Sequence, residues 1–285
     1  MEKPPVAPIR LIRYSDGNEE YMEDLLAVEE PLEIRLGFGD KDNRQQQRIS
    51  VTMRTPGNDF ELALGFLFTE SIIHSVEDIA SIKYCTDLNS KGNEFNVVRV
   101  ELKENIVFDS SSLQRNFYTT SSCGVCGKAS IEAVFQHCDR NIKSQFKVAE
   151  STILSLPLLL AKQQSVFTYT GGIHGCALFT TNGEFIQGRE DVGRHNALDK
   201  LIGAIIGSNQ NQFAESVLLL SGRASFELLQ KAAMAGIPMV AAIGAPSSLA
   251  VNIAKEADIT LIGFLKETRF NIYCGEQRVM RNSSN

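Results

Sequence analysis

Two cysteines three positions apart, Cys123 and Cys126, lie in the sequence TTSSCGVCG, just before a segment typical of a helix. A pair with this spacing suits four kinds of site: a structural zinc site, a thioredoxin-like redox centre, two unreactive thiols, or a sulfur carrier that holds sulfur as a persulfide. The function depends on which of these applies.

Zinc and thioredoxin-like sites each need a sequence context. Structural zinc takes four ligands, commonly with a second closely spaced pair. The other candidate ligands do not repeat such a spacing; they are His137, Cys138, His174 and Cys176. A thioredoxin-like pair would follow an early strand of a small βαβ fold, whereas this pair follows the polar stretch 109–120. We therefore expect no metal bound directly by the protein.

A sulfur carrier needs a nucleophilic and mobile thiolate. The helix expected over 128–138 would favour a thiolate at its N-terminus, with Lys128 nearby, and Gly124 and Gly127 free the loop to swing. Such a thiolate can attack a donor persulfide, and a second thiol can release the sulfur by forming a disulfide. Residue chemistry alone leaves this hypothesis and the redox centre both open.

Composition limits the class of protein. The chain has 285 residues, 43% hydrophobic and 22% charged, as in a soluble globular protein. A net charge of −6 argues against nucleic acid as a partner. We find neither a secretory signal nor an apolar run near the roughly 18 to 20 residues that span a membrane. The prediction is a cytoplasmic protein, with no membrane partner, whose six scattered cysteines stay reduced.

Residues 1–115 predict a smaller mixed α+β domain. One helix is expected after residue 58, because Phe60, Leu64, Leu67 and Phe68 share a helical face. Alternating or β-branched residues predict strands over 9–14, 32–38, 47–53 and 96–102. Residues 116–145 hold the cysteine loop and its helix.

Residues 146–285 predict an α/β domain. Continuous apolar strands that alternate with helices of about a dozen residues indicate βαβ units and a parallel sheet covered on both faces. The expected strands are 165–168, 176–180, 216–220, 238–243, 259–264 and 271–274. The expected helices are 151–163, 191–206, 224–235 and 247–257.

The carboxyl edge of this sheet is the predicted ligand site. Ligands of open parallel sheets gather there, where small residues let the backbone approach and cations hold phosphates. The residues placed after the strands are Ser221, Gly222, Arg223, Gly244, Lys266 and Arg269. Ordinary βα turns also use glycine and serine, so each loop alone has a simpler explanation.

Two other stretches stand out: 170–176 has paired glycines beside His174, and 188–196 has several charged and hydrogen-bonding residues around His195. His195 lies at the start of a predicted helix among hydrogen-bonding residues, so it is a candidate ligand contact. A single histidine is also a common structural residue, which is the alternative explanation. Asp191 has a simple alternative role as a helix cap.

Together these residues resemble the family of formate dehydrogenase accessory sulfurtransferases. The matching stretches are RTPGNDFELALGFLFTESII at 54–73, SSCGVCGKASIE at 121–132, TGGIHGCALF at 170–179, GREDVGRHNALDKLIG at 188–203, LLSGRASFELLQKAAMAGIPMVAAIGAPSSLAV at 219–251 and GFLKETRFNIY at 263–273. The resemblance implies a sulfurtransferase that accepts persulfide sulfur from a cysteine desulfurase on Cys123, with Cys126 as its partner. The acceptor would be a bis-molybdopterin guanine dinucleotide cofactor destined for formate dehydrogenase.

The resemblance also implies a cofactor-binding segment, a fold and a homodimer. The segment maps onto Phe264, Leu265, Lys266, Glu267, Thr268 and Arg269. The fold would be a cytidine-deaminase-like three-layer α/β domain after the smaller domain, although the chain lacks the zinc signature of the deaminases. The alternative function is a molybdenum-cofactor-binding chaperone without sulfur transfer.

Overall fold

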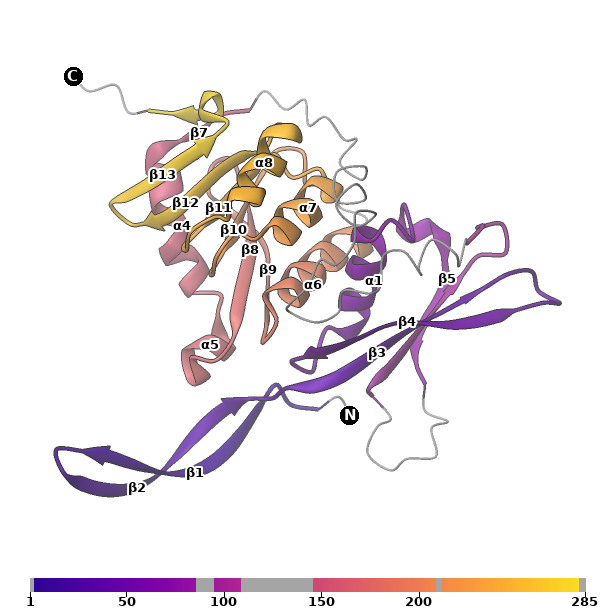
Figure 1. The fold of residues 1–285 in the computed structure, drawn as a ribbon, viewed down its shortest axis with the longest axis horizontal. Helices are drawn as coiled ribbons and strands as arrows, with labels where there is room; N and C mark the ends of the chain where they lie inside the picture. The colour runs from indigo at the N-terminus through magenta and orange to yellow at the C-terminus, as the bar shows by residue number, and fades with distance from the viewer. Residues whose placement is uncertain (1–2, 86–94, 109–145, 209–211, 282–285) are drawn as a thin grey trace.

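A six-stranded sheet forms the centre of the C-terminal half (Figure 1). The computed structural model describes residues 3–85, 95–108, 146–208 and 212–281. The strand order is β13 (Arg269–Cys274), β12 (Thr260–Lys266), β11 (Met239–Ala242), β10 (Ser216–Leu220), β8 (His174–Thr180) and β9 (Phe185–Asp191). Strands β10, β11 and β12 are parallel, and the outer three pair antiparallel. The sheet is therefore mixed, not wholly parallel as predicted.

Helices cover both faces of this sheet, which explains its continuous apolar strands. Val217 and Leu219 belong to a buried cluster with α4 (Glu150–Ala161), whereas Leu218 and Leu220 belong to the cluster on the other face. That face carries α6 (Arg194–Gly207), α7 (Phe226–Ala235) and α8 (Ser248–Glu256). Because both faces are buried, no position in β10 needs a polar side chain. The predicted three-layer α/β class is confirmed.

A second, four-stranded sheet and one helix make up the body of the N-terminal part. Its order is β4 (Gln45–Arg54), β3 (Glu30–Phe38), β6 (Val97–Leu102) and β5 (Ile79–Tyr84), with the short helix η1 (Val76–Asp78) before β5. Helix α1 (Asp59–Thr69) packs on this sheet and on α6. The buried side chains of the two parts form one continuous cluster.

Two glycines let α1 and α6 touch backbone to backbone. A Cβ on Gly65 would collide with the carbonyl oxygen of Asp199, and a Cβ on Gly203 with that of Glu61. Any larger residue at either position would force the helices apart. We call the contact of α1 and its flanking residues with α6 the seam.

The first two strands form a separate arm (Figure 1). Strands β1 (Val6–Ser15) and β2 (Asn18–Ala27) pair with each other in a two-stranded sheet that projects from the body. Asp16 and Gly17 close the hairpin with φ of 52° and 81°, the left-handed values of a tight hairpin turn. The sequence predicted β1 but not the acidic β2.

Two further predictions are wrong. Residues 165–168 form part of helix α5 (Ser165–Thr170), not a strand. The helix expected from residue 191 begins at Arg194, because residues up to Asp191 belong to β9. The helix predicted over 128–138 lies outside the described residues, and the predicted domain boundaries stay predictions.

Two short strands form a separate parallel pair. They are β7 (Val148–Ala149), just before α4, and β14 (Val279–Met280), just after the short helix η2 (Glu276–Arg278).

Within the described ranges, no helix is both long and apolar enough to cross a bilayer.

Candidate functional site

Hydrogen bonds between backbones tie the carboxyl ends of the parallel strands together. The N–H of Gly244, after β11, donates to the carbonyl of Gly222, after β10, at 3.0 Å. The N–H of Phe264, in β12, donates to the carbonyl of Gly244 at 3.0 Å. We call residues 221–225, 244–247 and 264–269 the rim. The sequence correctly predicted that the loops after β10 and β11 lie side by side.

Close packing explains one of the rim glycines. A Cβ on Gly244 would lie 3.0 Å from the carbonyl oxygen of Gly222 and 3.1 Å from the backbone N of Arg223. A Cβ on Gly222 would lie 3.4 Å from Nδ1 of His174, which is ordinary contact. Gly244 is therefore required by the packing of the two loops, whereas Gly222 leaves the backbone open beside His174.

Ser221 is also bound into the sheet. Its Oγ accepts a hydrogen bond from the N–H of Gly175 at 2.9 Å, and its own N–H donates to the carbonyl of Gly175 at 2.9 Å. Arg223, two positions on, is exposed and has no hydrogen bond or ion pair to any described residue. Of this predicted loop, the arginine is the side chain that is free to hold an anion.

The β12–β13 hairpin carries the predicted segment 264–269. Phe264 has a φ of 52°, rare for a non-glycine residue, and its side chain is 44% exposed. Leu265 is fully buried against the α4 side of the sheet, so its side chain is part of the core. The remaining four side chains of the segment are exposed: Lys266, Glu267, Thr268 and Arg269. Lys266 and Arg269 face each other across the hairpin.

A histidine pair lies beside the rim, where β8 begins and α6 begins. Nε2 of His195 lies 3.0 Å from Oε2 of Glu227 and 3.4 Å from Oγ of Ser225. The Ser225 hydroxyl donates to the same Glu227 oxygen at 3.2 Å. The hydrogen bond with His195 lowers the pKa of Glu227, against the effect of its partial burial. Glu227 therefore holds His195 in place as a charged carboxylate.

His174 has its pKa lowered chiefly by burial, then by the neighbouring charges of Arg194 and His195, with Asp191 opposing. Nε of Arg194 is buried and has no hydrogen-bond partner among the described residues. An unpaired guanidinium nitrogen next to an uncharged imidazole favours an anion at this end of the sheet.

Sequence reasoning missed Ser225 and Glu227, whereas Arg194 lies in the stretch 188–196 that it singled out around His195. Ser225 and Glu227 lie at the start of α7, where polar side chains at the carboxyl edge could have marked them. Their contact with His195, which is 30 or more positions away, has no local signal in the sequence.

Asp191 belongs to the seam, not to the rim. Its fully buried carboxylate accepts from the N–H of Thr55 at 3.1 Å and of Gly193 at 2.8 Å. Nζ of Lys200 lies 2.7 Å from the same carboxylate and donates to the carbonyl of Thr55 at 2.7 Å. Gly193 is the N-cap residue of α6, so Asp191 binds the turn that leads into the helix and clamps it to the N-terminal part.

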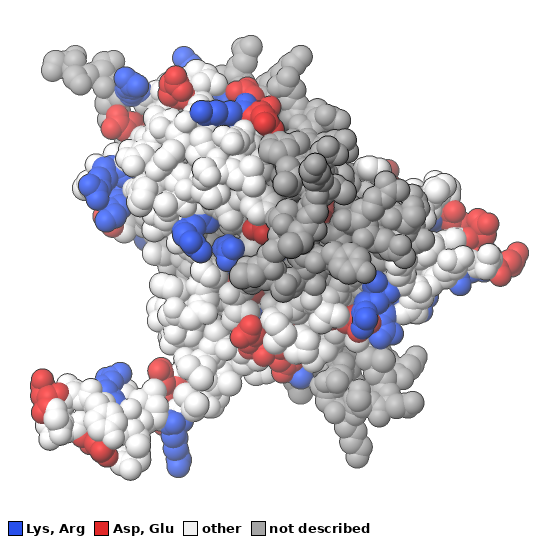
Figure 2. Space-filling model, viewed as in Figure 1, with Lys and Arg blue, Asp and Glu red and all other residues white. Residues whose placement is uncertain are grey.

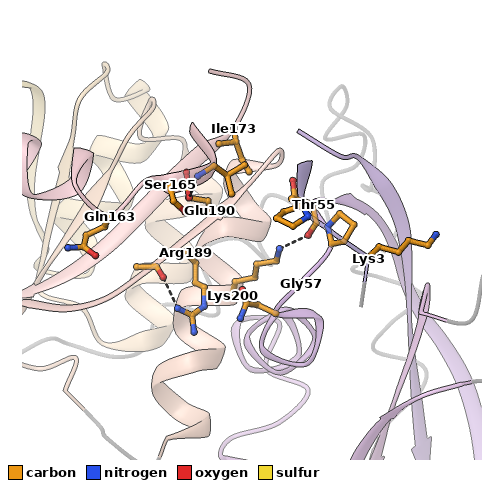
Figure 3. A pocket seen from close by; sticks show the side chains of 14 residues that line it. Lys3, Thr55, Gly57, Gln163, Ser165, Ile173, Arg189, Glu190 and Lys200 are labelled. Carbon is orange, nitrogen blue, oxygen red and sulfur yellow. Dashed lines mark hydrogen bonds between the residues drawn. The ribbon is translucent and has the colours of Figure 1, made fainter. Parts of the chain in front are cut away.

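A cavity of about 330 Å³ lies next to this clamp, between residues 55–58, 163–166 and 188–190 (Figure 3). Its charged side chains are already paired: Lys200 with Asp191, and Arg189 with Glu61 through two hydrogen bonds. The carboxylate of Glu190 accepts the N–H groups of Val166 and Phe167. These contacts are structural, so the charges around the cavity do not point to a ligand.

Cys123 and Cys126 lie outside the described residues, and their roles stay predictions. The described cysteines, Cys85, Cys176 and Cys274, are free thiols. Burial raises the pKa of Cys176 far above its usual range and also raises that of Cys274. Neither is therefore a ready nucleophile. In the described part of the chain, no cluster of three or more His, Cys, Asp or Glu could hold a metal ion.

Comparison with known proteins gives a consistent result. The model of the FdhD/NarQ family matches residues 27–280. A sulfur carrier protein FdhD from Mycolicibacterium paratuberculosis is 48% identical over 95% of this chain and 97% of its own. The sulfur carrier protein FdhD from Streptomyces avermitilis is 46% identical, over 95% of this chain and 94% of its own. The one from Sulfolobus acidocaldarius is 39% identical, over 96% of this chain and 98% of its own.

A solved structure shows the same fold. It is a protein from Desulfotalea psychrophila assigned as a formate dehydrogenase accessory protein, 23% identical in sequence. The match has a TM-score of 0.73 and covers 97% of this chain and 100% of that one. With the family match and the relatives above 30% identity, it follows that this chain belongs to the FdhD/NarQ family.

Proposed function

We propose that the protein is a cytoplasmic sulfur carrier that acts as a sulfurtransferase for formate dehydrogenase. It takes persulfide sulfur from a cysteine desulfurase on Cys123 and delivers it to a bis-molybdopterin guanine dinucleotide cofactor held at the rim. Support comes from the CGVC sequence and from relatives named sulfur carriers over almost the whole chain. The observation that carries the acceptor site is the rim, where Arg223, Lys266 and Arg269 have no partner among the described residues.

The transfer balances with two cysteines. The Cys123 thiolate attacks the outer sulfur of the donor persulfide; the donor S–S bond breaks, and the donor cysteine leaves as a thiolate. The Cys126 thiolate then attacks the Cys123 sulfur, a disulfide forms, and hydrosulfide leaves for the molybdenum of the acceptor. The two cysteines supply the two electrons that reduce the sulfane sulfur. A cellular dithiol must reduce the disulfide before the next cycle.

The rim offers the chemistry that a guanine dinucleotide needs. Arg223, Lys266 and Arg269 can hold phosphates. The exposed ring of Phe264 offers a face for a base, because its backbone is fixed by the hydrogen bond to Gly244. The partners that follow from this proposal are a cysteine desulfurase, formate dehydrogenase and a second copy of the chain.

Mass spectrometry after incubation with desulfurase and cysteine tests the sulfur step. We expect an added mass of ~32 Da on the peptide that holds Cys123, lost in Cys123→Ala and kept in the control Cys85→Ser. Cys123→Ala should still bind guanosine diphosphate while failing to activate formate dehydrogenase. If that variant activates the enzyme as well as the wild type does, the function is that of a cofactor-binding chaperone.

A further inference from the structure

The four-stranded sheet of the N-terminal part has a face that the function above does not use. Helix α1 covers the other face, where Ile34 and Val100 are buried in the core cluster. Neighbouring residues of a strand point to opposite faces, so Arg35 and Arg99 lie on the face away from α1. We call it the outer face. Because α1 lies between this sheet and α6, the outer face is turned away from the C-terminal part, which carries the rim.

Four cations form one row across the outer face. Arg35 in β3 lies opposite Arg48 in β4 and opposite Arg99 in β6, and Arg99 lies opposite Lys83 in β5. Residues directly opposite each other share a face, so the row crosses the sheet from edge to edge. Figure 2 shows basic side chains gathered over the strands that Figure 1 labels β3 and β4. This row stands out in a chain whose net charge is −6.

The row costs folding free energy, because like charges directly opposite each other destabilise a sheet. The two inner arginines are compensated by ion pairs with Glu33 and Glu101, which lie two positions away on the same strands. The two outer cations, Arg48 and Lys83, are exposed and have no hydrogen bond or ion pair to any described residue. Charges on edge strands also keep sheets from joining, but that role needs no cations on the central strands. A negatively charged partner accounts for the whole row.

The outer face fits the surface of a folded protein better than a nucleic acid. Glu33 and Glu101 stand among the arginines and would repel a chain of phosphates. Val51 and Met53 lie on the same face, opposite Glu33 and Pro31, and are 45% and 47% exposed. Arginine and methionine side chains are enriched in protein interfaces. The complementary surface is therefore an acidic patch with an apolar contact at β4.

We propose that the outer face is the docking surface for the sulfur donor, the cysteine desulfurase, through an acidic patch on that enzyme. The inference rests on the sulfur step of the proposed function and adds the place where the donor binds. Formate dehydrogenase must reach the cofactor at the rim, whereas the donor needs only Cys123. A donor on the outer face leaves the rim free, so donor and recipient do not compete for one surface.

Two charge reversals at the ends of the row test this surface. Arg48→Glu with Lys83→Glu removes both unpaired cations and places an anion opposite Arg35 and another opposite Arg99. The double variant should therefore unfold at no lower temperature than the wild type, and it should bind guanosine diphosphate equally well. Its Kd for purified cysteine desulfurase, measured by biolayer interferometry, should rise at least about tenfold, mainly through slower association.

The matched control is Lys147→Glu with Lys255→Glu, which has the same net charge and changes two exposed positions of the C-terminal part. It should bind the desulfurase as the wild type does, because these lysines lie outside the outer face. Equal losses of affinity in the two double variants would reveal a general effect of net charge and would overturn the docking surface.

Inorganic polysulfide separates this inference from the proposed function, because it delivers sulfur without a protein partner. The Cys123 thiolate takes one sulfur atom, and a shorter polysulfide leaves. The reversed variant should gain ~32 Da at Cys123 from polysulfide as fast as the wild type, but more slowly from limiting desulfurase and cysteine.

Three results would contradict the inference. Equal loading of the reversed variant and the wild type by the desulfurase would overturn the docking surface and leave sulfur transfer intact. A wild type that gains sulfur from neither source would overturn the proposed function and this inference together. A reversed variant that keeps the desulfurase but loses binding of formate dehydrogenase, or of duplex DNA, would assign the outer face to that partner instead.

Discussion

The seam and the rim both carry charged side chains, but they use them in opposite ways. In the seam, the buried Lys200 lies 2.7 Å from the carboxylate of Asp191 and donates to the carbonyl of Thr55, and the buried Lys231 lies 2.9 Å from Oδ1 of Asp199 and donates to Oγ1 of Thr69 at 2.9 Å. At the rim, Arg223 and Lys266 are exposed and have no partner among the described residues. The seam charges hold the two parts of the chain together, whereas the rim charges remain available.

The difference predicts where stability and binding reside. Removing one member of a buried pair leaves the other charged and unsolvated, which costs folding free energy. Removing an exposed charge without a partner changes the free energy of unfolding by less than about 0.5 kcal/mol. Substitutions in the seam should therefore affect folding, and those at the rim binding.

The largest effect is expected for Lys200→Met in the seam. The carboxylate of Asp191 would keep its backbone hydrogen bonds but lose its counter-charge in a fully buried place. We expect the free energy of unfolding to fall by about 3 to 5 kcal/mol, measured by urea denaturation. The matched rim control, Lys266→Met, should stay within about 0.5 kcal/mol. Equal losses in the two variants would remove the contrast between seam and rim.

Gly203→Ala should come next. The added Cβ meets the backbone carbonyl of Glu61, which cannot move without separating α1 from α6. Overpacking of this kind costs about 1 to 3 kcal/mol. Gly207→Ala, in the same helix, meets only the end of the Leu64 side chain at 3.3 Å, so it should be neutral or slightly stabilising. Were the two alanines to behave alike, the helices would not be in backbone contact.

At the rim, Arg223→Ala combined with Lys266→Ala should weaken binding of guanosine diphosphate. Charge-assisted contacts to phosphate are lost, and we expect the Kd to rise at least about tenfold in calorimetry, with a weaker dependence on salt. The control, Lys147→Ala with Lys255→Ala, removes two exposed charges away from the rim. An affinity that is the same in both double variants would exclude these cations from the site.

The sequence predicted what local patterns can determine. The buried strands β10, β11 and β12 were found because burial on both faces leaves uninterrupted apolar runs. The start of helix α5 was taken for a strand because Val166, Phe167 and Thr168 favour strands. Its N-terminal N–H groups are bound by Glu190, a contact from a different element that overrides local preference.

In the candidate site too, residues marked by a local pattern were predicted, and residues whose role depends on a contact with a distant element were not. Arg223 and Gly244 were found because they directly follow buried strands. Glu227 was missed because its significance lies in a contact with His195, which α6 brings to it. Asp191 looked like a helix cap from the sequence, and its contact with Lys200 depends on the packing of the two helices.

The smallest effect concerns pH. The unfolded chain binds a proton at His174 near pH 6.5, whereas burial and the charges of Arg194 and His195 lower the pKa in the folded state. The contribution of His174 to stability is therefore complete above about pH 6.5 and is lost as the pH falls through the folded pKa. Unfolding temperatures between pH 7.5 and 5.5 should fall less steeply in His174→Gln than in the wild type or in the control His74→Gln. Guanosine diphosphate should also flatten the wild-type profile, since an anion at the rim offsets the positive charge that disfavours protonation. A His174→Gln profile as steep as that of the wild type would show that this end of the sheet does not repel a proton.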